Sequence, residues 1–175
     1  MEIKKKAYFA GGCFWCITPV FTETDGVYSV MAGYCGGREE NPTYEDVKAQ
    51  KTQHRETICI EYDASVTGYR YLLDLFLKNV DLLDAEGQFI DRGHSYTLAV
   101  YYQCPDEQKI AEDCLKEFEK VLGEKPCVSL EPFEKFYTAE EYHQNYYLKN
   151  PEAFETELTE SGRRKRGGTW FSDKR

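Results

Sequence analysis

The stretch Gly11-Gly12-Cys13-Phe14-Trp15-Cys16 places two thiols on either side of two large aromatic side chains. The apolar residues before it, 7–10, are typical of the end of a buried strand, and a glycine pair lets the backbone turn sharply there. We therefore expect a helix to begin at about residue 14, with Cys13 at its first turn. Unpaired N–H groups at a helix start stabilise a thiolate and lower the pKa of the thiol. Cys13 is accordingly a candidate nucleophile.

Two other interpretations of Cys13 and Cys16 are that they are small core residues or one half of a zinc site. A structural zinc site needs two further ligands, and the sequence holds no second CxxC and no HxxxH. The sequence therefore predicts no metal site. The glycine turn, the expected helix start and the CxxC spacing together favour the nucleophile over an inert buried thiol.

Length and composition indicate one catalytic domain over residues 1–175. No apolar run approaches the roughly twenty residues of a membrane span, so no membrane partner is expected. The net charge of −9 argues against nucleic acid, and the basic run at 163–166 is expected to be solvated surface. Seven cysteines without a secretion signal indicate reduced thiols and a cytoplasmic protein.

Periodicity and turn residues predict an α+β fold. Strands are expected at 3–10, 27–33, 56–62, 95–102 and 127–130, and helices at 14–24, 44–49, 68–80 and 105–122. The order strand, helix, strand, strand, helix, strand is that of a ferredoxin-like split βαβ sheet, with helices packed on one face as an α/β sandwich. Extra helices and a coil-rich C-terminal segment from residue 132 complete the prediction.

Six motifs occur along the chain in an order that resembles one known family. They are Gly11-Gly12-Cys13-Phe14-Trp15, Gly33-Tyr34-Cys35-Gly36-Gly37, Asn41-Pro42-Thr43-Tyr44, His54-Arg55-Glu56, Asp91-Arg92-Gly93 with Tyr96, and Tyr142-His143-Gln144-Asn145-Tyr146-Tyr147. Together they resemble peptide methionine sulfoxide reductase of the A type, over residues 3 to about 170. The first motif is specific to that family, whose α/β sandwich agrees with the predicted fold.

The resemblance implies a reduction of methionine-S-sulfoxide in proteins, with the free amino acid as a further candidate substrate. In that reaction Cys13 attacks the sulfoxide sulfur and becomes a sulfenic acid. The oxygen leaves only when protonated, and Glu56 corresponds to the family's catalytic acid, a role that requires burial to raise its pKa. The remaining implied site residues are Tyr44 and Tyr96 at the sulfoxide oxygen, Asp91 as a second acid, and Phe14 and Trp15 as the aromatic wall for the substrate methyl group.

Turnover requires a second thiol, and the sequence has no cysteine after Cys127. Cys16, three residues after Cys13, is the expected resolving cysteine, and Cys35 in a glycine-rich loop is its competitor. The resemblance implies no bound cofactor, only an external dithiol reductant, thioredoxin or dithiothreitol.

Some positions depart from the family pattern, and other functions remain open. The common Gly-His-Ala-Glu is Gln53-His54-Arg55-Glu56 here, and His54 is interpreted either as a support for the site or as a surface-loop histidine. A thioredoxin-like CxxC disulfide oxidoreductase would account for Cys13 and Cys16 alone. A non-catalytic module that binds methionine in an aromatic pocket is the second alternative.

Overall fold

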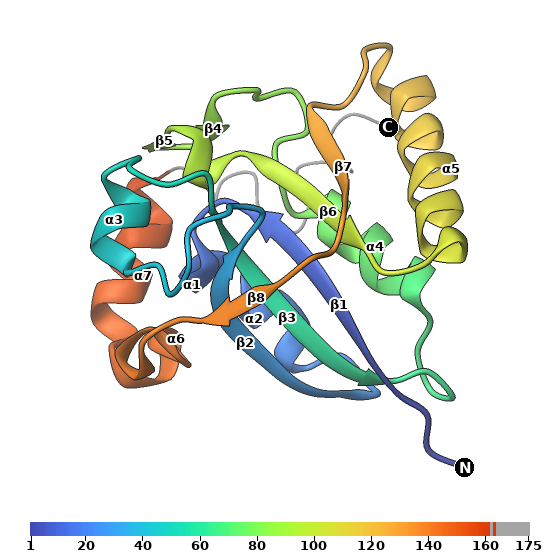
Figure 1. Cartoon of the computed structure of the whole chain (residues 1–175), viewed down its shortest axis with the longest axis horizontal. Coiled ribbons are helices and arrows are strands. Elements are labelled where there is room, and N and C mark those ends of the chain that lie inside the picture. Colours follow the sequence, from blue (N-terminus) through green and yellow to red (C-terminus); the bar gives the residue numbers. More distant parts are fainter. Residues whose placement is uncertain (162, 164–175) are drawn as a thin grey trace.

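The computed structural model describes residues 1–161 and 163, and its centre is a six-stranded mixed sheet (Figure 1). The strands are β1 (Lys4–Gly11), β2 (Val27–Cys35), β3 (Arg55–Asp63), β6 (Leu98–Tyr102), β7 (Val128–Pro132) and β8 (Phe136–Thr138), in the spatial order β7-β6-β1-β3-β2-β8. Neighbouring strands are antiparallel except β6 and β7, which run parallel. The order places β1, where Cys13 follows, directly beside β3, where Glu56 lies.

Seven helices are described in this part of the chain. They are α1 (Phe14–Ile17), α2 (Pro19–Thr22), α3 (Tyr44–Lys48), α4 (Tyr69–Lys78), α5 (Pro105–Leu122), α6 (Tyr146–Lys149) and α7 (Pro151–Glu160). A two-stranded hairpin of β4 (Gly87–Gln88) and β5 (Asp91–Arg92) precedes a 3-10 turn at His94–Tyr96. In Figure 1, α3, α6 and α7 gather at one end of the sheet, where α1 also begins, and α5 lies at the other end. No helix of the described residues is long and apolar enough to cross a membrane.

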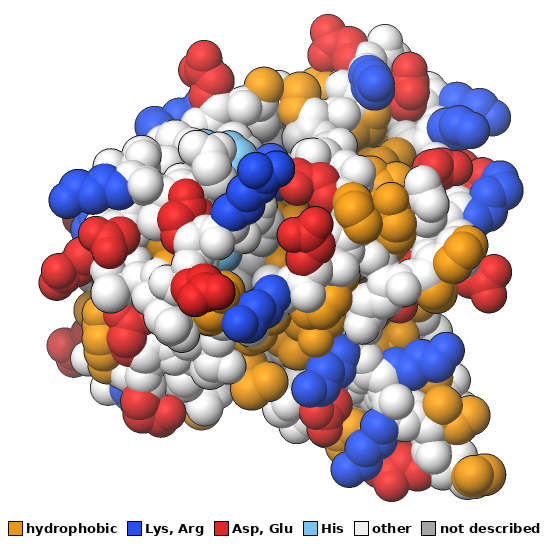
Figure 2. Space-filling view, in the orientation of Figure 1, with side chains coloured by type: hydrophobic (Ala, Val, Ile, Leu, Met, Phe, Trp, Pro, Cys, Tyr) orange, Lys and Arg blue, Asp and Glu red, His pale blue; other side chains and the backbone are white. Residues whose placement is uncertain are grey.

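The two faces of the sheet carry different cores because successive side chains of a strand point to opposite faces. Ala7 and Phe9 of β1 belong to the large core that the helices α1, α2, α4 and α5 cover. Tyr8 and Ala10 belong to a smaller core on the other face, against which Phe133 and Phe136 pack. Figure 1 shows the segment between β7 and β8 crossing that second face, and Figure 2 shows acidic and basic side chains interspersed on the same side of the molecule.

The fold differs from the sequence prediction at three places. The single helix expected at 14–24 is two short helices, because Pro19 has no N–H to continue the hydrogen bonding of α1 and begins α2 instead. The strand expected from residue 95 begins at Leu98, and Tyr96 lies in the 3-10 turn before it. The C-terminal segment, expected to be helix and coil, contains the helices α6 and α7 but also the strand β8, which was not expected. The mixed α/β class itself is confirmed.

Candidate active site

The turn after β1 brings Cys13 to the start of α1. Gly12 has φ +83°, a conformation that favours glycine, and a Cβ there would lie 2.7 Å from Gln88 Cβ. A Cβ on Gly11 would lie 2.7 Å from the ring of Phe76. Both glycines are therefore needed for the strand to turn this closely against α4 and the β4–β5 hairpin.

Cys13 lies among a second thiol and a carboxyl group. The sulfurs of Cys13 and Cys16 and a carboxylate oxygen of Glu157 lie within 4.8 Å of one another, and Cys13 Sγ is 3.9 Å from Glu157 Oε1. Cys13 is only 4% exposed. Glu157 comes from α7, far along the chain, and no motif in the sequence pointed to it.

The pKa of Cys13 is raised well above its ordinary value, which contradicts the lowered pKa expected from a helix start. The hydrogen bond with the Cys16 thiol is the largest cause, followed by burial, by the charge of Cys16 and then by the carboxyl groups of Glu56 and Glu157. The helix itself spans only Phe14–Ile17, so few aligned peptide dipoles oppose these effects. The resting site therefore holds a protonated thiol.

Glu56 lies on β3 with its side chain on the same face as Ile58, toward α1. Its Oε1 accepts a hydrogen bond from the Phe14 N–H at 3.3 Å, whereas its Oε2 is buried without a partner among the described residues. Burial raises the pKa of Glu56 to about 8, with a further contribution from the charge of Asp91, although the Phe14 N–H and the Tyr96 phenol act against the rise. The carboxyl group is therefore protonated at neutral pH, as the implied role requires.

Aromatic rings surround this acid and thiol. Phe14 lies 6.4 Å from Trp15 and 6.2 Å from Tyr44 between ring centroids, and Trp15 lies 6.1 Å from Tyr44. The phenol of Tyr96 is buried near Glu56 and Tyr44, and burial raises its pKa, so it remains a hydrogen-bond donor. The structure thus brings together the predicted thiol, acid, phenols and aromatic wall.

The segment 139–147 supports the aromatic wall of Phe14 and Trp15. The sequence showed a motif at 142–147 but did not indicate this supporting role. Trp15 Nε1 donates to His143 Nδ1 at 3.0 Å, and the Trp15 ring stacks on Tyr146 at 4.0 Å. Burial lowers the pKa of His143, which keeps this acceptor neutral. Glu140 accepts from the Tyr44 N–H at 3.1 Å. The C-terminal residues therefore fix the orientation of Trp15 and the start of α3.

Asp91 lies at the rim of the site beside a buried arginine. Burial raises the pKa of Asp91, and the charges of Arg163 and Lys48 oppose the rise. Arg163 is buried and donates to the Gly11 carbonyl at 3.3 Å, so its expected place in a solvated basic run is wrong; the rest of that run, 164–166, lies outside the described residues. This cation balances part of the acidic charge around Cys13.

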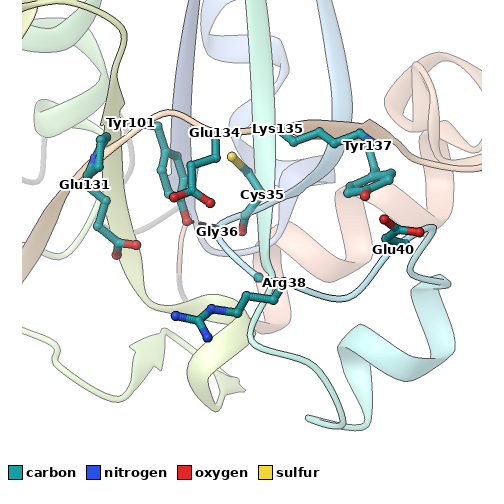
Figure 3. A pocket seen from close by; sticks show the side chains of 11 residues that line it. Cys35, Gly36, Arg38, Glu40, Tyr101, Glu131, Glu134, Lys135 and Tyr137 are labelled. Carbon is teal, nitrogen blue, oxygen red and sulfur yellow. Dashed lines mark hydrogen bonds between the residues drawn. The ribbon is translucent and has the colours of Figure 1, made fainter.

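Cys35 and His54 lie away from Cys13. Cys35 is 1% exposed on the second face of the sheet, where it lines a cavity of about 510 Å³ with Tyr101 and Glu131 (Figure 3). His54 is fully buried, accepts from the Gly37 N–H at 3.1 Å and lies 2.8 Å from the Glu39 carbonyl. The surface-loop interpretation of His54 is therefore wrong, because this side chain anchors the loop after β2.

A buried thiol pair beside a protonated carboxyl group, within aromatic walls on a mixed α/β fold, defines a thiol-based oxidoreductase. The chain matches the family model described as peptide methionine sulfoxide reductase over residues 5–174. It is 44% identical over 164 residues to peptide methionine sulfoxide reductase MsrA of Bacillus velezensis, covering 93% of each chain. It is 42% identical to MsrA 2 of Staphylococcus aureus, covering 92% of each.

A solved structure agrees with these sequence matches. Reduced Mxr1 from Saccharomyces cerevisiae is similar with a TM-score of 0.80 and 28% identity, over 85% of this chain and 87% of that one. The present chain belongs to the peptide methionine sulfoxide reductase family. Its activity is the reduction of methionine sulfoxide.

Proposed function

We propose that the chain reduces methionine-S-sulfoxide, protein-bound and free, with Cys13 as nucleophile and Glu56 as general acid. The observation that carries this proposal is the buried Glu56 carboxyl, which is protonated at neutral pH, has an Oε2 without a hydrogen-bond partner among the described residues, and lies near enough to Cys13 to raise its pKa. A sulfoxide oxygen is a poor leaving group until it is protonated. A carboxyl group that still holds its proton near pH 7 meets that need.

The first step joins the Cys13 sulfur to the sulfoxide sulfur. Glu56 donates a proton to the oxygen as the sulfur–oxygen bond breaks, and the proton of the Cys13 thiol restores the acid. The hydroxide so released then attacks the Cys13 sulfur and breaks its bond to the substrate sulfur, so that methionine leaves and Cys13 carries the oxygen. The net change converts the Cys13 thiol to a sulfenic acid and the sulfoxide to methionine, so the thiol is oxidised by two electrons and the substrate reduced by two. No bound cofactor is needed for this exchange.

The aromatic residues would select the substrate. Phe14 and Trp15 offer faces that desolvate a methyl group, and the phenols of Tyr44 and Tyr96 would donate hydrogen bonds to the sulfoxide oxygen. Asp91, close enough to raise the pKa of Glu56, would help to keep that acid protonated. The methyl group of the substrate would thus contact apolar aromatic faces, and the sulfoxide oxygen would contact hydrogen-bond donors.

The second thiol in the proposed cycle is Cys16. Its sulfur lies within 4.8 Å of Cys13 Sγ, whereas Cys35 points to the other face of the sheet. Attack by Cys16 on the sulfenic acid would form a Cys13–Cys16 disulfide and release water, after which a dithiol reductant restores both thiols. A non-catalytic binding module would have no use for this arrangement.

We propose thioredoxin as the reductant in the cell and dithiothreitol as its substitute in vitro. Yeast Mxr1 has been solved in complex with Trx2, and that structure shares the present fold at 21% identity and a TM-score of 0.54. Seven cysteines, all free among the described residues, are consistent with a cytoplasmic setting. Nucleic acids and membranes are not among the partners we propose.

We also propose that residues 1–175 form one catalytic domain around a ferredoxin-like split βαβ sheet. In support, β6, β1, β3 and β2 are neighbours in that order, with helices in the connections from β1 to β2 and from β3 to β6. The outer strands β7 and β8 would then be additions to this unit.

The decisive experiment measures methionine formed from a methionine-S-sulfoxide peptide with dithiothreitol as reductant. We expect turnover by the wild type and no product from Cys13→Ser, even in a single turnover, because a serine hydroxyl is not a nucleophile near pH 7. Insulin reduction without methionine formation would instead indicate a thioredoxin-like disulfide oxidoreductase. Product from Cys13→Ser at the wild-type rate would place the nucleophile elsewhere.

A further inference from the structure

The active-site thiols share their surroundings with a carboxylate that the sulfoxide reaction does not use. Glu157 Oε1 lies 3.9 Å from Cys13 Sγ, and this oxygen and the sulfurs of Cys13 and Cys16 all lie within 4.8 Å of one another. The CxxC spacing alone supplies two metal ligands, and the packing of α7 against α1 supplies the third. We propose that the reduced enzyme binds one Zn²⁺ ion through Cys13, Cys16 and Glu157, and that this ion inhibits it.

The spacing of the three donors is close to that of a zinc site. Zinc–sulfur bonds of about 2.3 Å and zinc–oxygen bonds of about 2.1 Å at tetrahedral angles place two sulfurs about 3.8 Å apart and a sulfur and an oxygen about 3.6 Å apart. The observed Cys13 Sγ to Glu157 Oε1 distance of 3.9 Å exceeds that value by only a few tenths of an ångström. The other two donor pairs lie within 4.8 Å, so side-chain rotations that shorten each by at most about 1.2 Å would complete the ligand set, with a water molecule as the fourth ligand.

The donor set selects the kind of metal. Two thiolates and one carboxylate favour zinc over magnesium or calcium, which prefer oxygen ligands alone. Binding replaces the two thiol protons, which pass to solvent, so that Zn²⁺ and two thiols give a zinc dithiolate and two protons. Asp91 lies close enough to act electrostatically on Glu157 and adds negative potential for a cation. Arg163 opposes this potential in part. Burial raises the pKa of Glu157, so metal binding also displaces any proton that this carboxyl group holds.

Such a site has a direct consequence for the reaction. Zinc bound to Cys13 and Cys16 occupies the electron pairs that attack the sulfoxide and resolve the sulfenic acid. Any disulfide at Cys13 removes one ligand, so the oxidised enzyme would not bind the metal. The site thus exists only in the reduced, reaction-ready form.

The test uses purified, reduced protein, titrated with zinc chloride and analysed for bound metal after equilibrium dialysis. We expect one zinc per chain in the wild type, and no bound zinc in Cys13→Ser, in Cys16→Ser or in the oxidised wild type. Glu157→Gln should weaken binding at least about tenfold, since loss of even an outer-shell partner costs 10- to 100-fold. Glu152→Gln, which changes an exposed carboxylate on the same helix, should bind like the wild type.

Spectroscopy and activity supply independent readouts. Cobalt(II) substituted for zinc should show thiolate charge-transfer bands and the intense visible absorption of tetrahedral coordination, both absent in Cys16→Ser. Zinc should inhibit sulfoxide reduction, and a chelator should restore it. Zinc retained by a Cys13→Ser/Cys16→Ser double variant, or equal affinity in Glu157→Gln and wild type, would overturn the proposal. These titrations contain no substrate, so their outcome is independent of the proposed catalytic roles.

Discussion

Cys13 and Glu56 both hold a proton in the resting site, and this pairing shapes the chemistry. The Cys16 thiol and burial raise the pKa of Cys13, and burial raises the pKa of Glu56 to about 8. A sulfoxide whose oxygen accepts the Glu56 proton leaves a carboxylate that can accept the thiol proton in turn. In the proposed mechanism the two groups would therefore exchange one proton through the substrate, and neither would need to be ionised in advance.

Glu56→Gln should slow single-turnover methionine formation by about 10²- to 10⁴-fold, the usual contribution of a positioned general acid. The amide keeps the shape of the side chain but has no acidic proton. In the wild type, the rate should fall as pH rises through about 8, where Glu56 ionises, and this decline should be absent in the variant. Rapid-quench measurements of product against pH test both points.

The matched control for Glu56 is Glu61→Gln, which changes a carboxylate on the same strand. It should keep both the wild-type rate and the wild-type pH profile. A Glu56→Gln rate within a factor of two of wild type at pH 7 would make Glu56 a structural residue.

Cys16→Ser should form one equivalent of methionine without reductant, because Cys13 remains available, and should lose thioredoxin-supported cycling. Proximity explains the choice of Cys16, since its sulfur lies within 4.8 Å of Cys13 Sγ. Cys35→Ser should cycle normally, because Cys35 belongs to the core on the other face of the sheet. Peptide mapping of the oxidised wild type gives the deciding observation: a Cys13–Cys35 linkage with Cys16 free would refute the assignment.

At the scale of elements, Gln144 hydrogen-bonds the segment 139–147 to Ala32 on strand β2. Its Oε1 accepts from the Ala32 N–H at 2.9 Å, and its Nε2 donates to the carbonyls of Ala32 and Ala139 at 2.9 and 3.0 Å. Both backbone groups of Ala32 on β2 are thus paired by one side chain. The same segment continues into His143 and Tyr146, which support Trp15.

Gln144→Ala should lower the free energy of unfolding by about 2–3 kcal/mol, since three hydrogen bonds of about 1 kcal/mol each are lost. The wall at Trp15 should loosen as well, which we expect to raise KM more than it lowers kcat. Urea denaturation and steady-state kinetics measure the two effects. Gln108→Ala on α5 serves as control and should change stability by less than about 0.5 kcal/mol. Equal stability of both variants would show that the segment is not anchored by Gln144.

The elements that the sequence predicted well are those with a local signal. Helix α5 begins at Pro105, as its first residues indicated, and the alternating pattern at 56–62 predicted the strand that is β3. The alternation predicted a half-buried strand, whereas β3 is buried on both faces. Strand β8 has only three residues and is defined by pairing with β2 about a hundred positions earlier, so no local pattern marks it. Helix α1 is short because Pro19 follows it. The lowered pKa expected for Cys13 is not found because the Cys16 hydrogen bond and burial raise it.

The candidate site shows the same division between local and distant signals. The motif around Cys13 and the resemblance named the thiol, the acid and the aromatic wall. Glu157 was not predicted as a site residue, because it lies 144 positions from Cys13 in the sequence and reaches Cys13 only through the packing of α7. Arg163 was not predicted as a site residue for a related reason. A run of basic residues predicts solvent-exposed side chains, and only the fold shows that Arg163 is buried against Gly11.

At the scale of the whole molecule, the sheet separates two polar networks. Arg55 and Glu56 are neighbours on β3 whose side chains point to opposite faces. Arg55 donates to Glu131 at 2.6 Å and to the Tyr101 hydroxyl at 3.1 Å on the second face, while Glu56 lies on the face with Cys13. Arg55 thereby pairs with Glu131, and no ion pair to Glu56 is found within residues 1–161 and 163. Burial then dominates its pKa.

Because burial dominates the pKa of Glu56, the free energy of unfolding should decrease as pH rises. The carboxyl has a pKa of about 8 in the folded state and an ordinary pKa of about 4.3 when unfolded. Between these values the unfolded state binds fewer protons than the folded state, so the free energy of unfolding falls with rising pH. Below the unfolded pKa the group contributes no slope, and above the folded pKa the loss is complete.

Urea denaturation at about pH 5 and about pH 9 measures the change in the free energy of unfolding, and Glu56→Gln removes the part of that change that Glu56 causes. The stability of Glu56→Gln relative to wild type should therefore rise by more than about 1 kcal/mol over that range, the equivalent of about one pKa unit. A difference between the two proteins that stays constant with pH would show that Glu56 titrates normally in the folded chain, and would remove the basis for its role as a protonated acid.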